Sequence, residues 1–195
     1  MIRVVGGEFK GRGLRAPRGL RTRPTAARVR EALFDLLGDV GGSVVLDLFA
    51  GSGALGIEAL SRGAREAVFV ERDRAAAAAL AANLARLGIG RDRARVVRGE
   101  VLGALQTALR RGWRYDLVFV DPPYAELGGW AQRLAPLLPA VVAKGGRLVV
   151  ESDRRAPPQL PWPVAIERAY GDTLIRIYAP PGSGAQRSMA GPAGR

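Results

Sequence analysis

The segment with the clearest chemical potential is Asp-Pro-Pro-Tyr at positions 121–124, which ends the apolar run Tyr115–Val120. Two successive prolines donate no backbone hydrogen bonds and fix two φ angles, so the chain should leave a strand in a stiff, extended conformation with free carbonyl acceptors. The exocyclic amine of a nucleobase needs such acceptors for its N–H groups and a ring on which to stack. The candidate catalytic residues are therefore Asp121, Pro122, Pro123 and Tyr124. A plain proline turn after a strand is the alternative reading.

A glycine-rich loop provides a second candidate site. The sequence G-x-G-x-x-G at positions 51–56 lies between an expected strand and an expected helix, and Glu71 closes the next strand about twenty residues later. Glycine allows a ligand to approach the backbone, and an acid in that place can bind ribose hydroxyls. Both NAD-dependent oxidoreductases and S-adenosylmethionine-dependent methyltransferases use this arrangement, so the loop alone does not separate the two classes.

Asp47 helps to separate them because it lies inside the strand before the glycine loop, where a dinucleotide-binding protein usually has apolar residues. A buried carboxylate is costly unless it meets a cation or N–H donors. Asp47 is therefore expected to meet the ammonium of a bound methionine moiety, to brace the glycine loop, or both.

The remaining candidates for cofactor binding lie at the same strand ends. Glu100 is placed either to contact adenine or to cap the helix that follows it, and Arg72 either to lie over the adenine or to face water. The full candidate set is Asp47, Phe49, Gly51, Ser52, Gly53, Glu71, Arg72, Glu100 and Val101.

Composition limits the chemistry and favours one kind of partner. The 195 residues include no cysteine and no histidine, which excludes thiolate nucleophiles and zinc–sulfur sites and removes the commonest general base. We therefore expect no metal site. Thirty basic against eighteen acidic residues give a net charge of +12, which favours a nucleic acid as partner. Without an apolar run long enough for a membrane span, the chain is expected to be cytoplasmic and free of membrane contacts. We also expect it to be a monomer.

The basic excess is concentrated at the start, where Glu8 is the only acid among residues 1–30. Short apolar stretches around Ile2–Val5 and Leu14, separated by glycines, predict a small β-hairpin from which arginines project. The candidate substrate-binding residues are Arg3, Lys10, Arg12, Arg15, Arg18, Arg21, Arg23 and Thr25. Thr25 can instead simply begin the helix that Gly38 ends.

From Val44 onward apolar strand runs alternate with helical patterns, which predicts a doubly wound α/β sheet. After Asp121 we expect a helix from about Trp130 to Ala143, a break at Gly145-Gly146 and a further strand. The runs on either side of Gly171-Asp172 predict an antiparallel hairpin that closes the sheet edge. The expected units are residues 1–24, a basic extension; residues 25–180, the main domain; and residues 181–195, a flexible tail.

Together these features resemble a known family. D-x-F-A-G-S-G at 47–53, the acid ending the second strand and D-P-P-Y at 121–124 are similar to class I methyltransferases that act on exocyclic amines. R-V-V-G-G-x-x-K-G-R-x-L at 3–14 and R-P-T-x-x-R-V-R-E-A-L-F at 23–34 resemble the RsmD-type 16S ribosomal RNA guanine-N2 methyltransferases. Glu100 departs from the aspartate that is common in related enzymes.

The resemblance implies a class I methyltransferase (Rossmann-like) fold, in which a seven-stranded, mostly parallel sheet carries a C-terminal antiparallel hairpin and a small N-terminal β-hairpin extension. It implies transfer of a methyl group from S-adenosylmethionine to N2 of one guanine of 16S rRNA, guanine 966 in the usual numbering, in small ribosomal subunits. Asp121 and the Pro122 carbonyl would accept the two N–H groups while Tyr124 stacks on the flipped base.

Three other functions stay open at this point. A methyltransferase for adenine or cytosine amines in DNA would use similar active-site residues, although the chain has no large target-recognition domain. An NAD-dependent oxidoreductase would share the glycine loop, but it gives Tyr124 no role. A non-catalytic rRNA-binding assembly factor would keep the basic hairpin and would tolerate the loss of Asp121.

Overall fold

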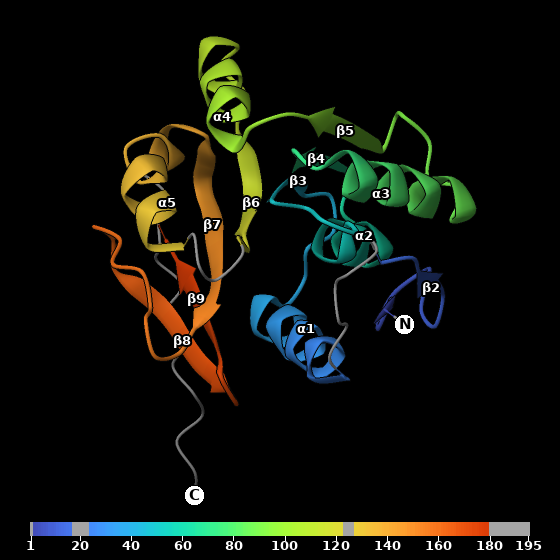
Figure 1. Ribbon diagram of the computed structural model, residues 1–195, viewed down its shortest axis with the longest axis horizontal. Coiled ribbons are helices and arrows are strands. Elements are labelled where there is room, and N and C mark those ends of the chain that lie inside the picture. Colours follow the sequence, from blue (N-terminus) through green and yellow to red (C-terminus); the bar gives the residue numbers. More distant parts are fainter. Residues whose placement is uncertain (1, 17–23, 123–126, 180–195) are drawn as a thin grey trace, which may run out of the picture.

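The computed structural model describes residues 2–16, 24–122 and 127–179. Their main feature is a sheet in the strand order β5-β4-β3-β6-β7-β9-β8 (Figure 1). Its strands are β3 (Val44–Leu48), β4 (Glu66–Glu71), β5 (Ala94–Arg98), β6 (Tyr115–Val120), β7 (Val142–Asp153), β8 (Val164–Tyr170) and β9 (Thr173–Tyr178). The first five are parallel, and β9 pairs antiparallel with both β7 and β8. The seven-stranded, mostly parallel sheet with a terminal antiparallel hairpin is thus confirmed.

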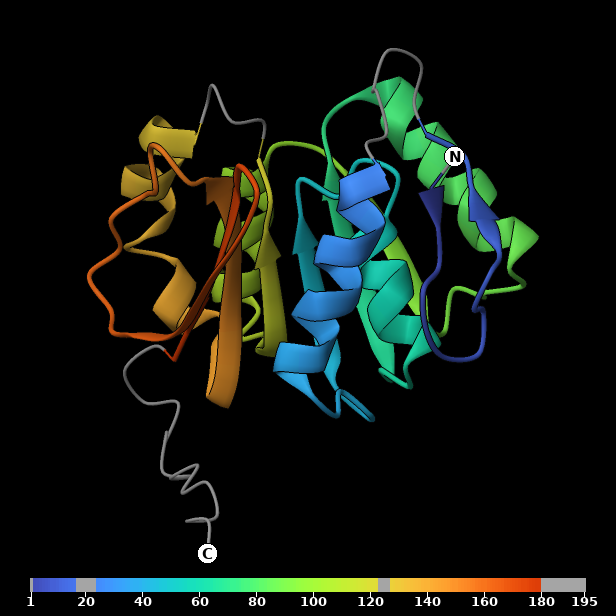
Figure 2. The same ribbon diagram turned by 90° about the horizontal axis from the view of Figure 1, so that it is seen from below.

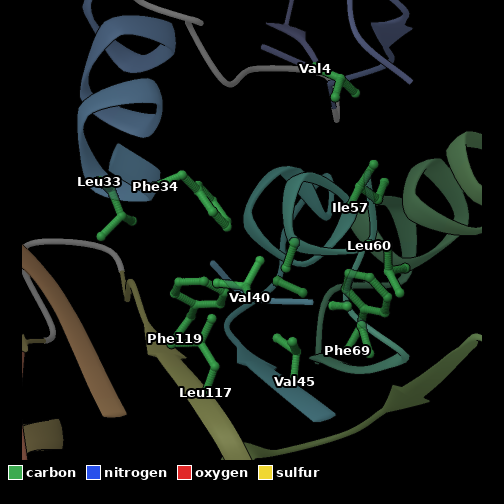
Figure 3. Close-up of a cluster of buried hydrophobic side chains, with 14 of the residues drawn as sticks. Val4, Leu33, Phe34, Val40, Val45, Ile57, Leu60, Phe69, Leu117 and Phe119 are labelled. Carbon is green, nitrogen blue, oxygen red and sulfur yellow. The ribbon is translucent and has the colours of Figure 1, made fainter. Parts of the chain in front are cut away.

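Helices cover both faces of this sheet (Figures 1 and 2). They are α1 (Pro24–Leu37), α2 (Ala54–Ser61), α3 (Arg74–Arg86), α4 (Val101–Arg110), α5 (Leu127–Leu134) and the 3-10 turn η2 (Leu138–Ala140). Because side chains alternate along a strand, each face has its own core. Val45, Leu117 and Phe119 pack with α1, α2 and α3 in the core drawn in Figure 3. The intervening residues, such as Leu46 and Val118, pack with α4 and α5.

One predicted region differs from the structure. The helix expected from about Trp130 to Ala143 ends at Leu134, and η2 follows it. Pro136 explains this end because proline has no N–H group with which to continue the helix. The break expected at Gly145-Gly146 is also wrong, since β7 begins at Val142 and runs through both glycines. They lie where the pairing with β6 shifts its register, as in a β-bulge.

The predicted N-terminal hairpin is present as β1 (Ile2–Arg3) paired with β2 (Gly13–Leu14). It is fastened to α2 through Glu58, whose side chain is fully buried. The Glu58 carboxylate accepts hydrogen bonds from the backbone N–H groups of Val5 at 2.9 Å and Gly6 at 2.8 Å. It also forms ion pairs with Arg30 at 3.4 Å and Arg62 at 2.9 Å. The hairpin is therefore packed onto the sheet domain by a satisfied buried charge rather than tethered loosely.

Within the described ranges, no helix is long and apolar enough to cross a membrane.

Replacing Glu58 tests this attachment. In Glu58→Ala, Arg30 and two backbone N–H groups lose their acceptor inside the protein, so the free energy of unfolding should fall by about 3 kcal/mol. Urea unfolding followed by circular dichroism measures the change. Glu31→Ala, at an exposed position of α1, is the control and should change stability by less than about 0.5 kcal/mol. Equal effects of the two substitutions would contradict a structural role for Glu58.

Candidate functional site

The candidate site lies at the carboxyl ends of the parallel strands, where ligands bind in open α/β sheets. The chain turns sharply after β3, and Phe49 adopts a left-handed conformation with φ of 64°. Such a conformation is strained for a non-glycine residue and is often found at functional sites. The Phe49 ring packs edge-on against Trp130 of α5, with ring centroids 5.1 Å apart. Gly53, with φ of 80°, is the N-cap residue immediately before α2.

Asp47 braces this turn. Its side chain is buried, and its Oδ2 accepts a hydrogen bond from the N–H of Gly56 at 2.9 Å. Gly56 must be glycine because a Cβ there would lie 2.3 Å from the Phe69 ring and 3.1 Å from Asp47 Oδ2. Burial raises the pKa of Asp47 to about 7, although the Gly56 hydrogen bond opposes the shift. The bracing contact expected from the sequence is thus observed.

Glu71 also supports the glycine loop. One carboxylate oxygen accepts from the N–H of Gly51 at 2.8 Å and the other from the N–H of Asp73 at 2.7 Å. Each carboxylate oxygen can accept more than one hydrogen bond, so Glu71 retains acceptor sites for ligand hydroxyls. Its position beside the loop fits the place expected for a ribose-binding acid.

Glu100 and Arg72 lie further out. Glu100 occupies the N-cap position of α4 but makes no side-chain cap hydrogen bond. Its carboxylate is 4.0 Å from the guanidinium of Arg72, and both side chains are more than half exposed. Glu100 is therefore at the cap position that the sequence predicts, but its side chain does not cap the helix. Val101, the next residue, is buried.

Asp121 has an acidic neighbour that sequence reasoning missed. Val120 of β6 pairs with Val150 of β7, so Asp121 and Glu151 follow in register on adjacent strands. Both carboxyl groups belong to the sheet face that also carries Asp47, because Asp47 pairs with Phe119. Burial, then the charges of Glu151 and Asp47, raise the pKa of Asp121 well above its ordinary value. The sequence signal that could have indicated Glu151 is its place at the end of an apolar strand run, just before Ser152.

Three carboxyl groups thus gather where β3, β6 and β7 end. The charges of Glu151 and Asp47 disfavour ionisation of Asp121, and a cation would relieve that repulsion. In the part of the chain that the structure describes, no cluster of potential metal ligands is found.

Asn83 is a second residue that sequence reasoning missed. It is buried in α3, and its side chain pairs with the backbone of Arg15, accepting from the N–H at 2.7 Å and donating to the carbonyl at 3.0 Å. The same amide donates to the carbonyl of Ser52 in the glycine loop at 3.0 Å. Asn83 therefore joins the N-terminal segment to the loop. It is the chain's one asparagine, but nothing in its sequence context indicated this role.

Of the basic candidates, Arg3, Lys10, Arg12 and Arg15 are exposed on the hairpin and the segment after it. Pro122 is buried next to Asp121. The other candidates lie outside the described residues or have side chains that do: Arg18, Arg21, Arg23, Thr25, Pro123 and Tyr124.

Comparisons with known proteins show which sequences and structures this chain resembles. A sequence model of the family described as Conserved hypothetical protein 95 matches residues 2–179. Ribosomal RNA small subunit methyltransferase D of Escherichia coli K12 is 39% identical over 183 residues, which are 91% of this chain and 89% of the relative. The solved structure of a hypothetical protein from Thermus thermophilus has 36% identity and a TM-score of 0.78, covering 91% of this chain and 98% of that one.

More distant structures share the fold alone. SMU.776, solved in complex with SAH, has 16% identity and a TM-score of 0.67 over 80% of this chain and 50% of that chain. These findings confirm the family resemblance and the class I methyltransferase fold inferred from the sequence.

The raised pKa of Asp47 makes stability depend on pH. The folded protein holds a proton on Asp47 up to about pH 7, whereas the ordinary value is 3.8. Between these values the folded state binds more protons than the unfolded state, so stability falls as the pH rises. Asp47→Asn keeps an acceptor for Gly56 and removes the titration. Urea unfolding at pH 4.5 and pH 8 should show a relative gain for the variant on the order of 3 kcal/mol at the higher pH. A difference that is independent of pH would refute the assignment.

Proposed function

This chain belongs to the Conserved hypothetical protein 95 family, and from that premise we propose that it methylates small-subunit ribosomal RNA at the N2 amine of a guanine. S-adenosylmethionine is the methyl donor. The observation that carries the proposal is the group of carboxyls formed by Asp47, Asp121 and Glu151 beside a glycine loop. The relative from Escherichia coli, named as a small-subunit rRNA methyltransferase, supports the choice of substrate.

The cofactor suits the charges of the site. S-adenosylmethionine carries a positive sulfonium and an ammonium group, whereas the rest of this protein has a strong positive excess. The local carboxyls would attract those cationic groups and would become ionised more easily beside them. Glu71 would bind the ribose hydroxyls, and Glu100 and Arg72 would border the adenine.

The bound cofactor supplies an electrophilic methyl group; the protein must then position a weak nucleophile. The lone pair of a guanine amine is delocalised into the ring, so orientation carries much of the catalysis. Asp121 and the Pro122 carbonyl would accept the two N–H groups and direct the nitrogen toward the methyl. Tyr124 would stack on the base and exclude water.

Asp121 is also the group that would take the proton. Positive charge develops on the amine as the methyl transfers, and a nearby carboxylate stabilises it. With no histidine in the chain, carboxylates are the available bases. The raised pKa of Asp121 makes it a stronger proton acceptor than an ordinary aspartate, provided that it is ionised when the reaction begins.

The substrate is tested with labelled S-adenosylmethionine and four acceptors: small ribosomal subunits, naked 16S rRNA, large-subunit rRNA and DNA. Modified nucleosides are identified by mass. N2-methylguanosine from the small-subunit RNA is the expected product. Methyladenine or methylcytosine from DNA would favour the DNA enzyme, and tight RNA binding without any transfer would favour an assembly factor.

Glu151 should set the acidic limb of the pH profile. Its charge helps to raise the pKa of Asp121, so Glu151→Gln should lower that pKa. Because Asp121 must be ionised to take the proton of the amine, the rise of kcat/KM with pH should then begin at a lower pH. The profile is measured with rRNA and S-adenosylmethionine, and Asp153→Asn, further along β7, is the control. If Glu151→Gln left the acidic limb of the kcat/KM profile at the same pH, this would contradict an effect of Glu151 on the pKa of Asp121.

A further inference from the structure

A basic cleft lies at the opposite end of the sheet from the candidate site. A cleft of about 350 Å³ opens where β3, β4, β5 and β6 begin. Its polar lining is dominated by Arg65, Arg91, Arg93, Arg95 and Arg114. We call it the amino-end cleft. Because a strand of six residues spans roughly 20 Å, the cleft is well separated from the glycine loop.

Most of this positive charge faces solvent. Arg65, Arg91, Arg95 and Arg114 are exposed. Glu66 and Asp92 also line the cleft, but its five arginines outnumber these two acids. Among the residues that the structure describes, Arg65, Arg91 and Arg114 form no salt bridge with a carboxylate. Such a cluster fits a polyanion, which would release counterions on binding.

An exposed aromatic ring lies among these arginines. Trp113 is 38% exposed, whereas Trp130 and Trp162 are each 7% exposed. The Arg95 guanidinium carbon lies 4.5 Å from the centroid of the Trp113 ring. A guanidinium lying against an exposed indole forms a platform on which an unpaired base can stack.

The amino-end cleft continues toward the N-terminal hairpin. Arg93 pairs with Glu8 of the hairpin at 3.3 Å and donates to the Leu60 carbonyl at 3.0 Å. Figure 2 shows the hairpin turn beside the chain that leads from α3 into β5. The exposed Lys10 and Arg12 of the turn thus extend the same basic surface.

We propose that the amino-end cleft binds a second, single-stranded segment of the RNA, with phosphates on its arginines and a base on Trp113. The inference rests on the proposed function, since it takes RNA as the substrate. The bound segment is distinct from the target nucleotide because the cleft and the carboxyl ends of the strands lie at opposite ends of the sheet. Single-stranded RNA is favoured over a duplex because a paired base has no free face for the indole.

Binding of a ten-nucleotide oligouridine, followed by fluorescence anisotropy over a range of KCl concentrations, tests the proposal. The double variant Arg91→Gln and Arg114→Gln should bind about tenfold more weakly, with a salt slope smaller by about 1.4, from about 0.7 per lost phosphate contact. The matched control, Arg154→Gln with Arg168→Gln, removes the same charge beside the other edge of the sheet and should bind like wild type. Equal weakening of the two double variants would overturn the cleft as a site.

Trp113 provides an independent readout. Trp113→Ala should weaken binding about tenfold, whereas Trp113→Phe should retain most of the affinity and lose the quenching of tryptophan fluorescence that oligouridine causes in wild type. Thermal melting confirms that each variant folds. Unchanged affinity of Trp113→Ala for oligouridine would overturn the assignment of the base to Trp113. The single-strand assignment would be overturned if wild type bound a ten-base-pair RNA duplex as tightly as oligouridine and the variants lost affinity for both equally.

These measurements do not require methyl transfer, so the two proposals can fail separately. If wild type methylates no RNA, the proposed function fails, and the oligouridine comparison still decides the cleft. If wild type methylates rRNA, the cleft variants should raise KM for rRNA about tenfold with kcat within twofold. An unchanged KM would overturn the cleft while leaving the methyltransferase proposal intact.

Discussion

Much of this structure depends on carboxyl groups held at the ends of neighbouring parallel strands in a protein with a net charge of +12. Asp47 is buried beneath the glycine loop, and Asp121 is placed next to Glu151 by the register of β6 and β7. Burial raises the pKa of both aspartates, with added repulsion from Glu71 at Asp47 and from Glu151 and Asp47 at Asp121. A cationic ligand beside these two aspartates would lower the energy of their ionised forms. This penalty is the kind of strain that functional sites retain at the expense of stability.

Buried polar side chains extend this organisation to the N-terminal hairpin. Glu58 fixes the strands of the hairpin to α2, and Asn83 fixes the segment after it to both α3 and the glycine loop. Each satisfies backbone groups that would otherwise be buried without partners. The basic hairpin and the glycine loop are thus held in one fixed geometry. Exposed arginines supply charge, whereas these two buried residues determine where that charge lies.

The sequence predicted what local patterns encode. Continuous apolar runs gave the parallel strands, and the spacing from Asp47 through Gly56 to Glu71 gave the loop with its flanking acids. Prediction failed where the answer depended on contacts between distant segments. Glu151 becomes a neighbour of Asp121 only through strand register, and Asn83 meets Arg15 across 68 positions of sequence. The helix predicted after Asp121 is too long because the periodic apolar residues continue past Pro136, whereas the helix does not.

The central claim is that Asp121 acts on the amine rather than on the cofactor. The most direct test measures S-adenosylmethionine affinity by calorimetry and single-turnover methyl transfer to small-subunit rRNA, for wild type and Asp121→Ala. The account predicts that transfer of methyl to guanine N2 falls by at least about 10²-fold, the lower end for a lost general acid or base, while cofactor affinity changes only a few-fold. Transfer at the wild-type rate, or a loss explained entirely by weaker cofactor binding, would contradict it.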